Sequence, residues 1–408
     1  MTRNQSPRRR SLYLAVGVFC MLFSGVLYAW SILKIPLKES LGYTDSELAL
    51  NFTFTMCFFC LGAFFGSLIC KRLGVRLTLC ISAALVAFGF SLTGMLGASA
   101  PHALLYLTYA ICAGTGIGIS YNVVVSTVNM WFPDKKGFST GCLMMGFGVS
   151  TLLLGSVISV LFDTPAFGMP GTYILVGIVI GTVILVSALI LKRPEPGTQL
   201  PAPGRSAKAF RESFEARDYT TKEMLTSFTF YRVFVQMAFI TAVGNSVISF
   251  ARDMMLTAGA APALATTLVG VLSVSNGIGR ILTGAAYDAF GRKITMTGSA
   301  VLTIAAAAVA LLGSALYSFP LCLVGLCLSG LSYGSCPTLT SAFTASFYGQ
   351  AYFPVNYSLT NFNLIVAAFI ANGANALLIS SGSYVAPFAL LLTLAVIALG
   401  LNFTIKRP

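Results

Sequence analysis

The chain contains 408 residues, of which 56% are hydrophobic and 9% are charged, whereas an ordinary soluble domain has roughly 25% charged residues. This composition excludes a soluble globular protein, because so few charged side chains could not cover the surface of a chain of this length. A transmembrane helix needs about 20 mainly apolar residues, so the length allows about a dozen spans with short loops. We therefore predict an all-α integral membrane protein.

Twelve apolar stretches lie between clusters of charged and turn-forming residues. We predict membrane-spanning helices near residues 12–37, 48–70, 77–98, 102–130, 138–161, 171–191, 227–250, 262–287, 294–316, 319–347, 353–379 and 383–405. The runs are long and continuous, which excludes the short alternating strands of a membrane barrel. The first run follows three arginines like an export signal, but it is too long for one, so we expect an uncleaved helix.

Lysine and arginine residues are divided unevenly between the two sets of loops. Of the 25 in the chain, all lie on one side except Lys34, Lys38, Arg252 and Arg280. Positively charged loops remain in the cytoplasm, so we expect both termini to be cytoplasmic. The net charge of +13 is therefore a signal of membrane topology and does not indicate binding to nucleic acid.

Arg280 lies inside the eighth predicted span, in a run that is uncharged from Asp253 to Asp288 apart from the arginine itself. Asp288 lies eight residues after Arg280, which corresponds to about 12 Å along a helix. An arginine at such depth costs about 2.5 kcal/mol or more and usually faces an internal cavity. The acidic residues lie at predicted helix ends or in loops, so we favour an anionic substrate over an internal ion pair as the partner. A guanidinium can hold a carboxylate through two parallel hydrogen bonds.

The longest polar stretch separates six predicted spans from six. We predict an N-terminal six-helix bundle at 1–191, a cytoplasmic linker at 192–224 and a C-terminal six-helix bundle at 225–408. Each half has a similar sequence after its second span, GAAYDAFGRK at 284–293 and SLICKRLGVR at 67–76. This repeat resembles the signature loop of the major facilitator superfamily, in which an aspartate and basic residues latch neighbouring helix ends. The resemblance implies a latch formed by Asp288, Gly291 and Arg292, whereas the N-terminal copy has Lys71 in place of the aspartate.

A narrower resemblance is carried by NMWFPDKKGFSTG at 129–141, together with FSGVLYAWS at 23–31, SYGSCP at 332–337 and NYS at 356–358. These segments are similar to the oxalate/formate antiporter family, a bacterial branch close to the monocarboxylate transporters. The resemblance implies a substrate site between two six-helix bundles that rock to give alternating access. It also implies a bacterial inner membrane, and we expect a monomer. In this context GTGIG at 114–118 is expected to be a close-packing helix face and not a nucleotide-binding loop.

The same resemblance implies further substrate-binding residues. The family has a substrate-binding arginine at the place of Arg280, and Asn276 lies one helical turn earlier on the same face. The other candidates are polar or aromatic residues within the spans, or residues at places where the family has cavity side chains: Tyr28, Tyr121, Asn122, Phe147, Tyr333, Asn361, Asn363 and Leu364. The alternative for the tyrosines is ordinary packing, and for the asparagines it is hydrogen bonding between helices.

The substrate class follows from where the chain departs from the oxalate/formate family. Leu364 stands where that family has a second cavity cation, Ser329 replaces a tryptophan, and Phe147 replaces a tyrosine. One cation balances one carboxylate, so we expect a small monocarboxylate such as lactate or pyruvate rather than oxalate. Monocarboxylate relatives imply symport with a proton, although no carboxylate or histidine lies in the interior of a predicted span. Exchange of carboxylates is the alternative.

Two other classes of protein are disfavoured. A membrane sensor that retains the fold would be expected to carry a soluble signalling domain, and both tails are short. An enzyme is not expected, because the spans contain no catalytic triad, metal cluster or acid–base pair. We therefore predict no cofactor and no metal ion, and the expected partners are a monocarboxylate anion, a proton and the lipid bilayer.

Overall fold

A computed structural model of the chain describes residues 7–195, 198, 200, 201 and 217–406. Every regular element in these residues is helical, and ten helical stretches are long and apolar enough to cross a membrane. Two of the ten contain a residue with non-helical backbone angles, which divides each into two spans. The predicted all-α fold with twelve spans is thereby confirmed. Most of the predicted linker at 192–224 lies outside the described residues.

The structure divides into two compact units. The first unit comprises Met1–Lys135 and Gly146–Pro203, and the second comprises Lys136–Met145 and Gly204–Pro408. The fifth span therefore begins in the second unit and continues into the first. This differs from a simple division at the predicted linker, because the start of that span packs with the C-terminal helices.

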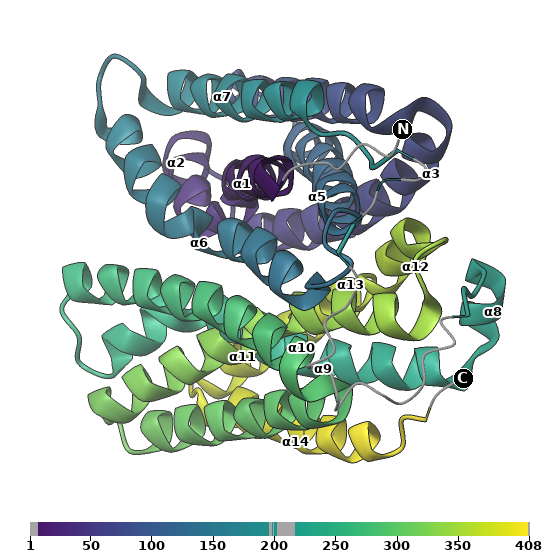
Figure 1. The fold of residues 1–408 in the computed structure, drawn as a ribbon. Helices are drawn as coiled ribbons and strands as arrows, with labels where there is room; N and C mark the ends of the chain where they lie inside the picture. The colour runs from purple at the N-terminus through teal and green to yellow at the C-terminus, as the bar shows by residue number, and fades with distance from the viewer. Residues whose placement is uncertain (1–6, 196–197, 199, 202–216, 407–408) are drawn as a thin grey trace. The chain divides into compact units, whose positions relative to one another are not determined.

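The first unit is built from the following helices (Figure 1): α1 (Pro7–Ser24), the 3-10 helix η1 (Gly25–Ala29), α2 (Trp30–Leu41), α3 (Asp45–Gly94), α4 (Ala103–Leu105), the π-helix η2 (Tyr106–Gly114), α5 (Thr115–Asn129), the larger part of α6 (Lys136–Asp163) and α7 (Gly168–Ile190). The first predicted span is therefore three consecutive segments and not one regular helix. The fourth span changes from α to π geometry and back. Such irregular stretches in a helix frequently occur at functional sites.

The second unit contains the start of α6 and seven further helices (Figure 1): α8 (Thr221–Thr226), α9 (Phe228–Thr257), α10 (Pro262–Ala315), α11 (Phe319–Tyr348), α12 (Phe353–Thr360), α13 (Asn363–Ser381) and α14 (Val385–Phe403). The eleventh predicted span, 353–379, is interrupted between α12 and α13. The short helix α8 lies at the end of the predicted linker and was not expected from the sequence.

The two breaks in the long helices fall on the glycines of the repeated signature. Gly74 in α3 has φ 78° and ψ 173°, and Gly291 in α10 has φ 75° and ψ −178°. Positive φ at these values is readily available to glycine and is costly for other residues. The two copies of the signature therefore make the same backbone turn, which explains why glycine recurs at this place in both halves.

The glycine-rich stretch at 114–118 packs closely against α3. A Cβ atom at Gly118 would lie 2.0 Å from the carbonyl oxygen of Phe59, and one at Gly116 would lie 2.7 Å from a methyl carbon of Val86. Neither position has room for a larger residue. The prediction of a close-packing helix face is confirmed.

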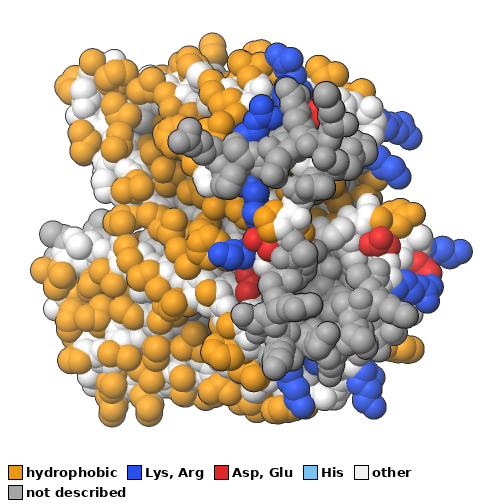
Figure 2. All heavy atoms as spheres, viewed as in Figure 1, with side chains coloured by type: hydrophobic (Ala, Val, Ile, Leu, Met, Phe, Trp, Pro, Cys, Tyr) orange, Lys and Arg blue, Asp and Glu red, His pale blue; other side chains and the backbone are white. Residues whose placement is uncertain are grey.

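Charged and apolar side chains occupy different parts of each unit. The lysine and arginine side chains visible in Figure 2 lie toward one end of the helices, and hydrophobic side chains cover much of the remaining visible face. Large apolar residues such as Phe88, Phe228 and Ile379 are well exposed. An apolar surface of this extent is typical of a protein that contacts lipid.

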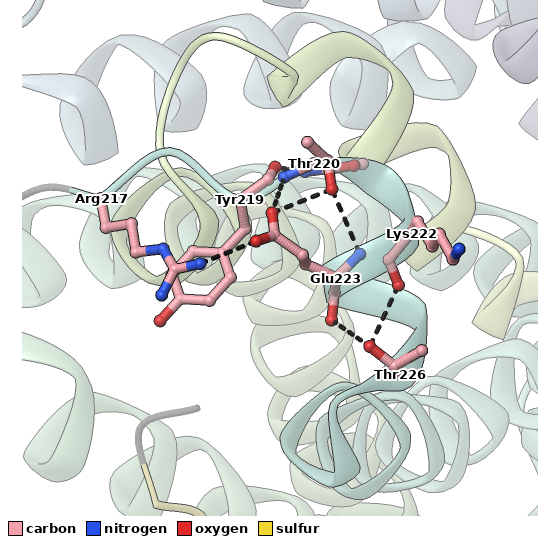
Figure 3. Close-up of polar contacts among 7 residues, drawn as sticks. Arg217, Tyr219, Thr220, Lys222, Glu223 and Thr226 are labelled. Atoms are coloured by element: carbon pink, nitrogen blue, oxygen red, sulfur yellow. Dashed lines mark hydrogen bonds and ion pairs between the residues drawn. The ribbon is translucent and has the colours of Figure 1, made fainter.

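The end of the linker is held by a network of polar contacts (Figure 3). Glu223 and Thr220 form a capping box at the start of α8, and Arg217 donates a hydrogen bond to Glu223 over 2.7 Å. Asp218 accepts hydrogen bonds from the backbone N–H groups of Gln350 and Ala351, at 2.7 and 3.0 Å. These contacts fix α8 to the loop between α11 and α12.

Candidate substrate-binding site

Arg280 is buried in α10, with 1% of its surface exposed. Its Nε donates a hydrogen bond to Oδ1 of Asn276 over 2.9 Å, and its Nη1 donates to the carbonyl oxygen of Met144 over 2.7 Å. Its Nη2 is also buried and makes no hydrogen bond to any residue that the structure describes. The guanidinium therefore retains unused donors toward a further acceptor.

Asn276 orients the arginine. It lies four residues before Arg280 on the same helix, so the two side chains share a face, and its amide oxygen is already an acceptor for Nε. The structure shows that its oxygen fixes the plane of the guanidinium. Contact between this amide and a substrate stays a prediction.

Two glycines from other helices allow close approach to the backbone of Arg280. A Cβ atom at Gly141 of α6 would lie 2.7 Å from the carbonyl oxygen of Arg280, and one at Gly334 of α11 would lie 3.1 Å from its amide nitrogen. Thr338 of α11 also donates a hydrogen bond to the same carbonyl oxygen over 3.4 Å. The sequence thus places small residues where α6 and α11 pack against α10, and this packing holds the start of the arginine side chain in place.

Asp288 lies on α10, two helical turns beyond Arg280, and its side chain contacts the start of α6. Its carboxylate accepts hydrogen bonds from the backbone N–H groups of Gly137 and Phe138, at 3.0 and 2.9 Å. The N-cap residue of α6, Lys135, forms no side-chain cap of its own. A carboxylate at a helix N-terminus satisfies free N–H groups and interacts favourably with the helix dipole. The arrangement is that of a latch between two helix ends.

The other two latch candidates lie close to Asp288 in the sequence. Gly291 makes the turn described above. Arg292 donates a hydrogen bond to the carbonyl oxygen of Ile405 over 3.5 Å, and its guanidinium carbon lies 5.4 Å from the ring centre of Phe347. Arg292 therefore contacts the end of α14 and the end of α11, whereas Asp288 contacts α6.

The aromatic candidates of the first unit lie together. Phe147 is in edge contact with Tyr28, at 5.2 Å between ring centres, and with Tyr121, at 5.4 Å. Phe59 of α3 joins the same cluster, 5.0 Å from Tyr121 and 6.1 Å from Phe147. Tyr28 lies in η1, where the first span departs from α-helical geometry. Asn122, next to Tyr121 on α5, is fully buried.

The remaining candidates belong to the second unit. Tyr333 of α11 is buried and packs against Gly244 of α9, where a Cβ atom would lie 2.3 Å from its ring. Asn361, Asn363 and Leu364 lie where α12 ends and α13 begins, and all three are buried. Asn363 donates a hydrogen bond to the carbonyl oxygen of Thr360 over 2.7 Å. Within the described part of the chain, the hydrogen bonds of the Arg280 side chain go to Asn276 and Met144 and not to these candidates of α11, α12 and α13.

Sequence reasoning missed the roles of five residues. The Met144 carbonyl was missed because a backbone acceptor has no sequence signal of its own. The spacing of Gly137 and Gly141, a small-xxx-small pattern, could have indicated that this stretch of α6 packs closely on another helix. Phe59 and Gly244 had no signal, because a phenylalanine or a glycine is ordinary in an apolar span.

The twelve spans, the repeated glycine turn and the buried cation together define a membrane transporter. The chain belongs to the major facilitator superfamily. The family model described as "Major Facilitator Superfamily" matches residues 13–242, and that described as "Sugar (and other) transporter" matches residues 208–406.

Relatives of known name are also transporters. The chain is 27% identical to the oxalate:formate antiporter of Oxalobacter formigenes over 406 residues, which is 97% of this chain and 91% of the relative. It is 31% identical to human monocarboxylate transporter 11 over 145 residues, which covers 35% of this chain and 29% of that protein. The resemblance to the oxalate/formate branch is thereby confirmed.

Solved structures share the fold at low sequence identity. The proton:xylose symporter XylE gives a TM-score of 0.75 with 14% identity, over 98% of this chain and 97% of that one. The fucose:proton symporter FucP of E. coli gives a TM-score of 0.68 with 14% identity, over 98% of this chain and 100% of that one. These similarities establish the fold and do not identify the substrate.

Proposed function

We propose that the protein transports small monocarboxylates, such as lactate or pyruvate, across a bacterial inner membrane by alternating access. The observation that carries the proposal is the buried guanidinium of Arg280, whose Nη2 makes no hydrogen bond to any described residue. A carboxylate supplies both the negative charge and the two acceptor oxygens that such a group requires. Both termini are proposed to be cytoplasmic, and the protein is proposed to act as a monomer.

The charge of the site supports a monocarboxylate over a dicarboxylate. Among the described residues whose burial is known, Arg280 is the only buried charged side chain, so one substrate carboxylate balances it. Leu364 is apolar and 8% exposed. We propose that it lines the site beside the short carbon chain of the substrate, together with Tyr333, Asn361 and Asn363.

We propose proton symport as the mode of coupling. Partial relatives are named as monocarboxylate transporters, which supports the proposed substrate class. A proton can be carried on the substrate carboxyl group itself, which requires no buried acid in the protein. Because the anion and the proton together carry no net charge, symport also allows net uptake without building up charge across the membrane.

Exchange of one carboxylate for another is the second candidate. The observation that favours it is the 27% identity to the oxalate:formate antiporter, because that similarity extends over 97% of the chain. In exchange, a carboxylate would occupy Arg280 during both directions of transport, and no proton would be required.

Uptake into proteoliposomes distinguishes the two modes. Labelled lactate, pyruvate, formate and oxalate would be offered with an imposed pH gradient, with and without trapped counter-anion. Symport predicts faster lactate uptake when the outside is acidic and the vesicles contain no anion. An absolute requirement for trapped anion would instead establish exchange, and transport of oxalate alone would contradict the proposed substrate class.

The role of Arg280 is tested by substitution. Arg280→Ala should abolish binding of labelled lactate to the purified protein, because the charge and the donors are lost together. Arg252→Ala is the matched control, since Arg252 is half exposed at the end of α9, and it should bind lactate as the wild type does. A folded Arg280→Ala variant with unchanged lactate affinity would refute the proposed site.

A further inference from the structure

The start of α6 is fastened to α10 at two levels. At one level, Asp288 accepts hydrogen bonds from the N–H groups of Gly137 and Phe138. At the other, two turns away, Arg280 donates a hydrogen bond to the carbonyl oxygen of Met144. The substrate-binding arginine is thus itself one of the ties that hold the start of α6.

Close backbone packing connects the two levels. A Cβ atom at Gly284 of α10 would lie 2.3 Å from the carbonyl oxygen of Gly137, and one at Gly141 would lie 2.7 Å from the carbonyl oxygen of Arg280. The two helices therefore meet backbone to backbone along this stretch. A contact of this kind is stable only while both helices keep their register, so a displacement at Met144 is transmitted toward Gly137.

Two of the five N–H groups of Arg280 are already in use, and each way of forming a two-bond grip on a carboxylate involves a nitrogen that already donates. Such a grip uses Nη2 together with either Nε or Nη1. Nε already donates to Asn276, which lies on the same helix and moves with the arginine, and Nη1 already donates to Met144. The Nη2 atom is also buried, so a ligand reaches it only if a covering element moves.

We propose that the Met144 carbonyl is an internal competitor for the substrate. A carboxylate that binds Arg280 through two bonds replaces the hydrogen bond to Met144, and the start of α6 is released from α10. Substrate binding and the α6–α10 contact are therefore mutually exclusive. This inference rests on the proposed function, because it requires a carboxylate to bind at Arg280.

Hydrogen–deuterium exchange of the peptide covering residues 136–146 provides the first test. Saturating lactate should increase exchange there in the purified wild-type protein, since the N–H groups of Gly137 and Phe138 lose their acceptor. The same addition should leave this peptide unchanged in Arg280→Ala. If lactate raises the melting temperature of the wild type but exchange in 136–146 stays the same or decreases, the competition is refuted. If lactate produces no thermal shift at all, the proposed function fails as well.

The second test weakens the α6–α10 contact without touching the guanidinium. Gly284→Ala should increase lactate affinity by about threefold or more, because the competing contact is populated less. Gly298→Ala on the same helix is the matched control, since a Cβ atom there meets nothing within 4 Å, and its affinity should match the wild type. Asp288→Asn, which weakens the same contact at the Gly137 and Phe138 N–H groups, should also increase lactate affinity and replaces Gly284→Ala if that variant does not fold. A folded variant of either kind with unchanged or lower affinity would overturn the inference.

Discussion

Arg280 has three nitrogens in three different surroundings, which fits a structural role together with the proposed binding of a carboxylate. Nε is held by Asn276 within α10, Nη1 is held by the Met144 carbonyl, and Nη2 has no partner among the described residues. Only a planar cation with several N–H groups can donate hydrogen bonds in these three directions at the same time. Lysine has one ammonium nitrogen and cannot reproduce the arrangement.

Arg280→Lys is therefore expected to bind lactate at least about tenfold more weakly, a loss of about 1.4 kcal/mol in binding free energy. The charge is retained, so the loss measures the geometry of the fork and not electrostatics alone. Lactate affinity of the purified variant, compared with Arg280→Ala and the wild type at one ionic strength, checks the prediction. Equal affinity in the lysine variant and the wild type would exclude a two-bond grip.

Leu364→Lys is expected to change the choice of substrate. A second cation in the site should weaken lactate binding and improve binding of oxalate relative to lactate by about tenfold, or about 1.4 kcal/mol. The physical reason is that a charge pair about 4 Å apart gains roughly 4 kcal/mol at an effective dielectric constant of 20, before desolvation is subtracted. Competition of oxalate against labelled lactate measures the ratio. An unchanged ratio in a folded variant would show that Leu364 does not line the site.

At the scale of helices, the first unit depends on close contact between α3 and α5. The glycines of α5 permit this contact, and the aromatic cluster of Phe59, Tyr121 and Phe147 lies on helices positioned by it. Small residues at helix interfaces in membranes allow van der Waals packing that larger residues prevent. The cluster is therefore expected to be sensitive to substitutions in the glycine stretch.

Gly118→Ala should lower the stability of the protein by about 1–3 kcal/mol, as expected for overpacking. The added methyl group would lie 2.0 Å from the Phe59 carbonyl oxygen, so the backbone must shift. Gly400→Ala on α14 is the control, because a Cβ atom there has open space, and it should remain within about 1 kcal/mol of the wild type. Thermal unfolding in detergent compares the two variants. Similar melting temperatures for both would show that the α3–α5 contact can relax.

The helix α8 is expected to be sensitive to acid. Hydrogen bonds from the Thr220 backbone and hydroxyl, with a further contribution from Arg217, hold the pKa of Glu223 below its usual value of 4.5. For a carboxyl group with a lowered pKa, the stabilising effect is complete above the usual value and is lost as the pH falls through the folded-state pKa. Protection of residues 217–226 against hydrogen exchange, corrected for intrinsic rates, should therefore decrease below about pH 4.5.

A substitution separates this effect from general acid unfolding. Glu223→Gln should increase tryptic cleavage after Lys222 at neutral pH, since the charged acceptor of the capping box is lost. Glu195→Gln in the same predicted linker is the control and should be cleaved as the wild type is. If both variants were cleaved at the wild-type rate, the capping box would not hold α8 in place.

Several features of these helices could be predicted from the sequence and others could not. Long apolar runs and the recurrence of glycine at 74 and 291 predicted the spans and the turns, because both depend on local chemistry. The break between α12 and α13 and the irregular geometry at Tyr28 could not be predicted, because the residues there are compatible with a regular helix. The contact between Arg280 and Met144 depends on packing between segments distant in the sequence, which explains why Met144 was missed.

At the scale of the whole molecule, the composition was the most informative feature. The small share of charged residues predicted a membrane protein, and the length of the chain allowed about a dozen spans. The same shortage of charge makes the exception at Arg280 conspicuous, and the structure shows that this side chain is buried without an ion pair among the described residues. The position of the buried cation could therefore be predicted from the sequence, whereas the identity of a substrate could not.

A single buried positive charge also makes the transport cycle responsive to the membrane potential. In exchange, Arg280 with a bound carboxylate moves no net charge when the protein reorients, whereas in proton symport the empty protein returns with the positive charge of Arg280. Moving one full charge through 100 mV corresponds to about 2.3 kcal/mol. An interior negative potential, set with potassium and valinomycin, should therefore slow net lactate uptake, which requires the empty protein to return, and leave lactate-for-lactate exchange unchanged at constant pH. Equal voltage dependence of both activities would mean that Arg280 does not cross the electric field. If only net uptake depends on voltage, the resting voltage of the cell itself favours exchange over net transport.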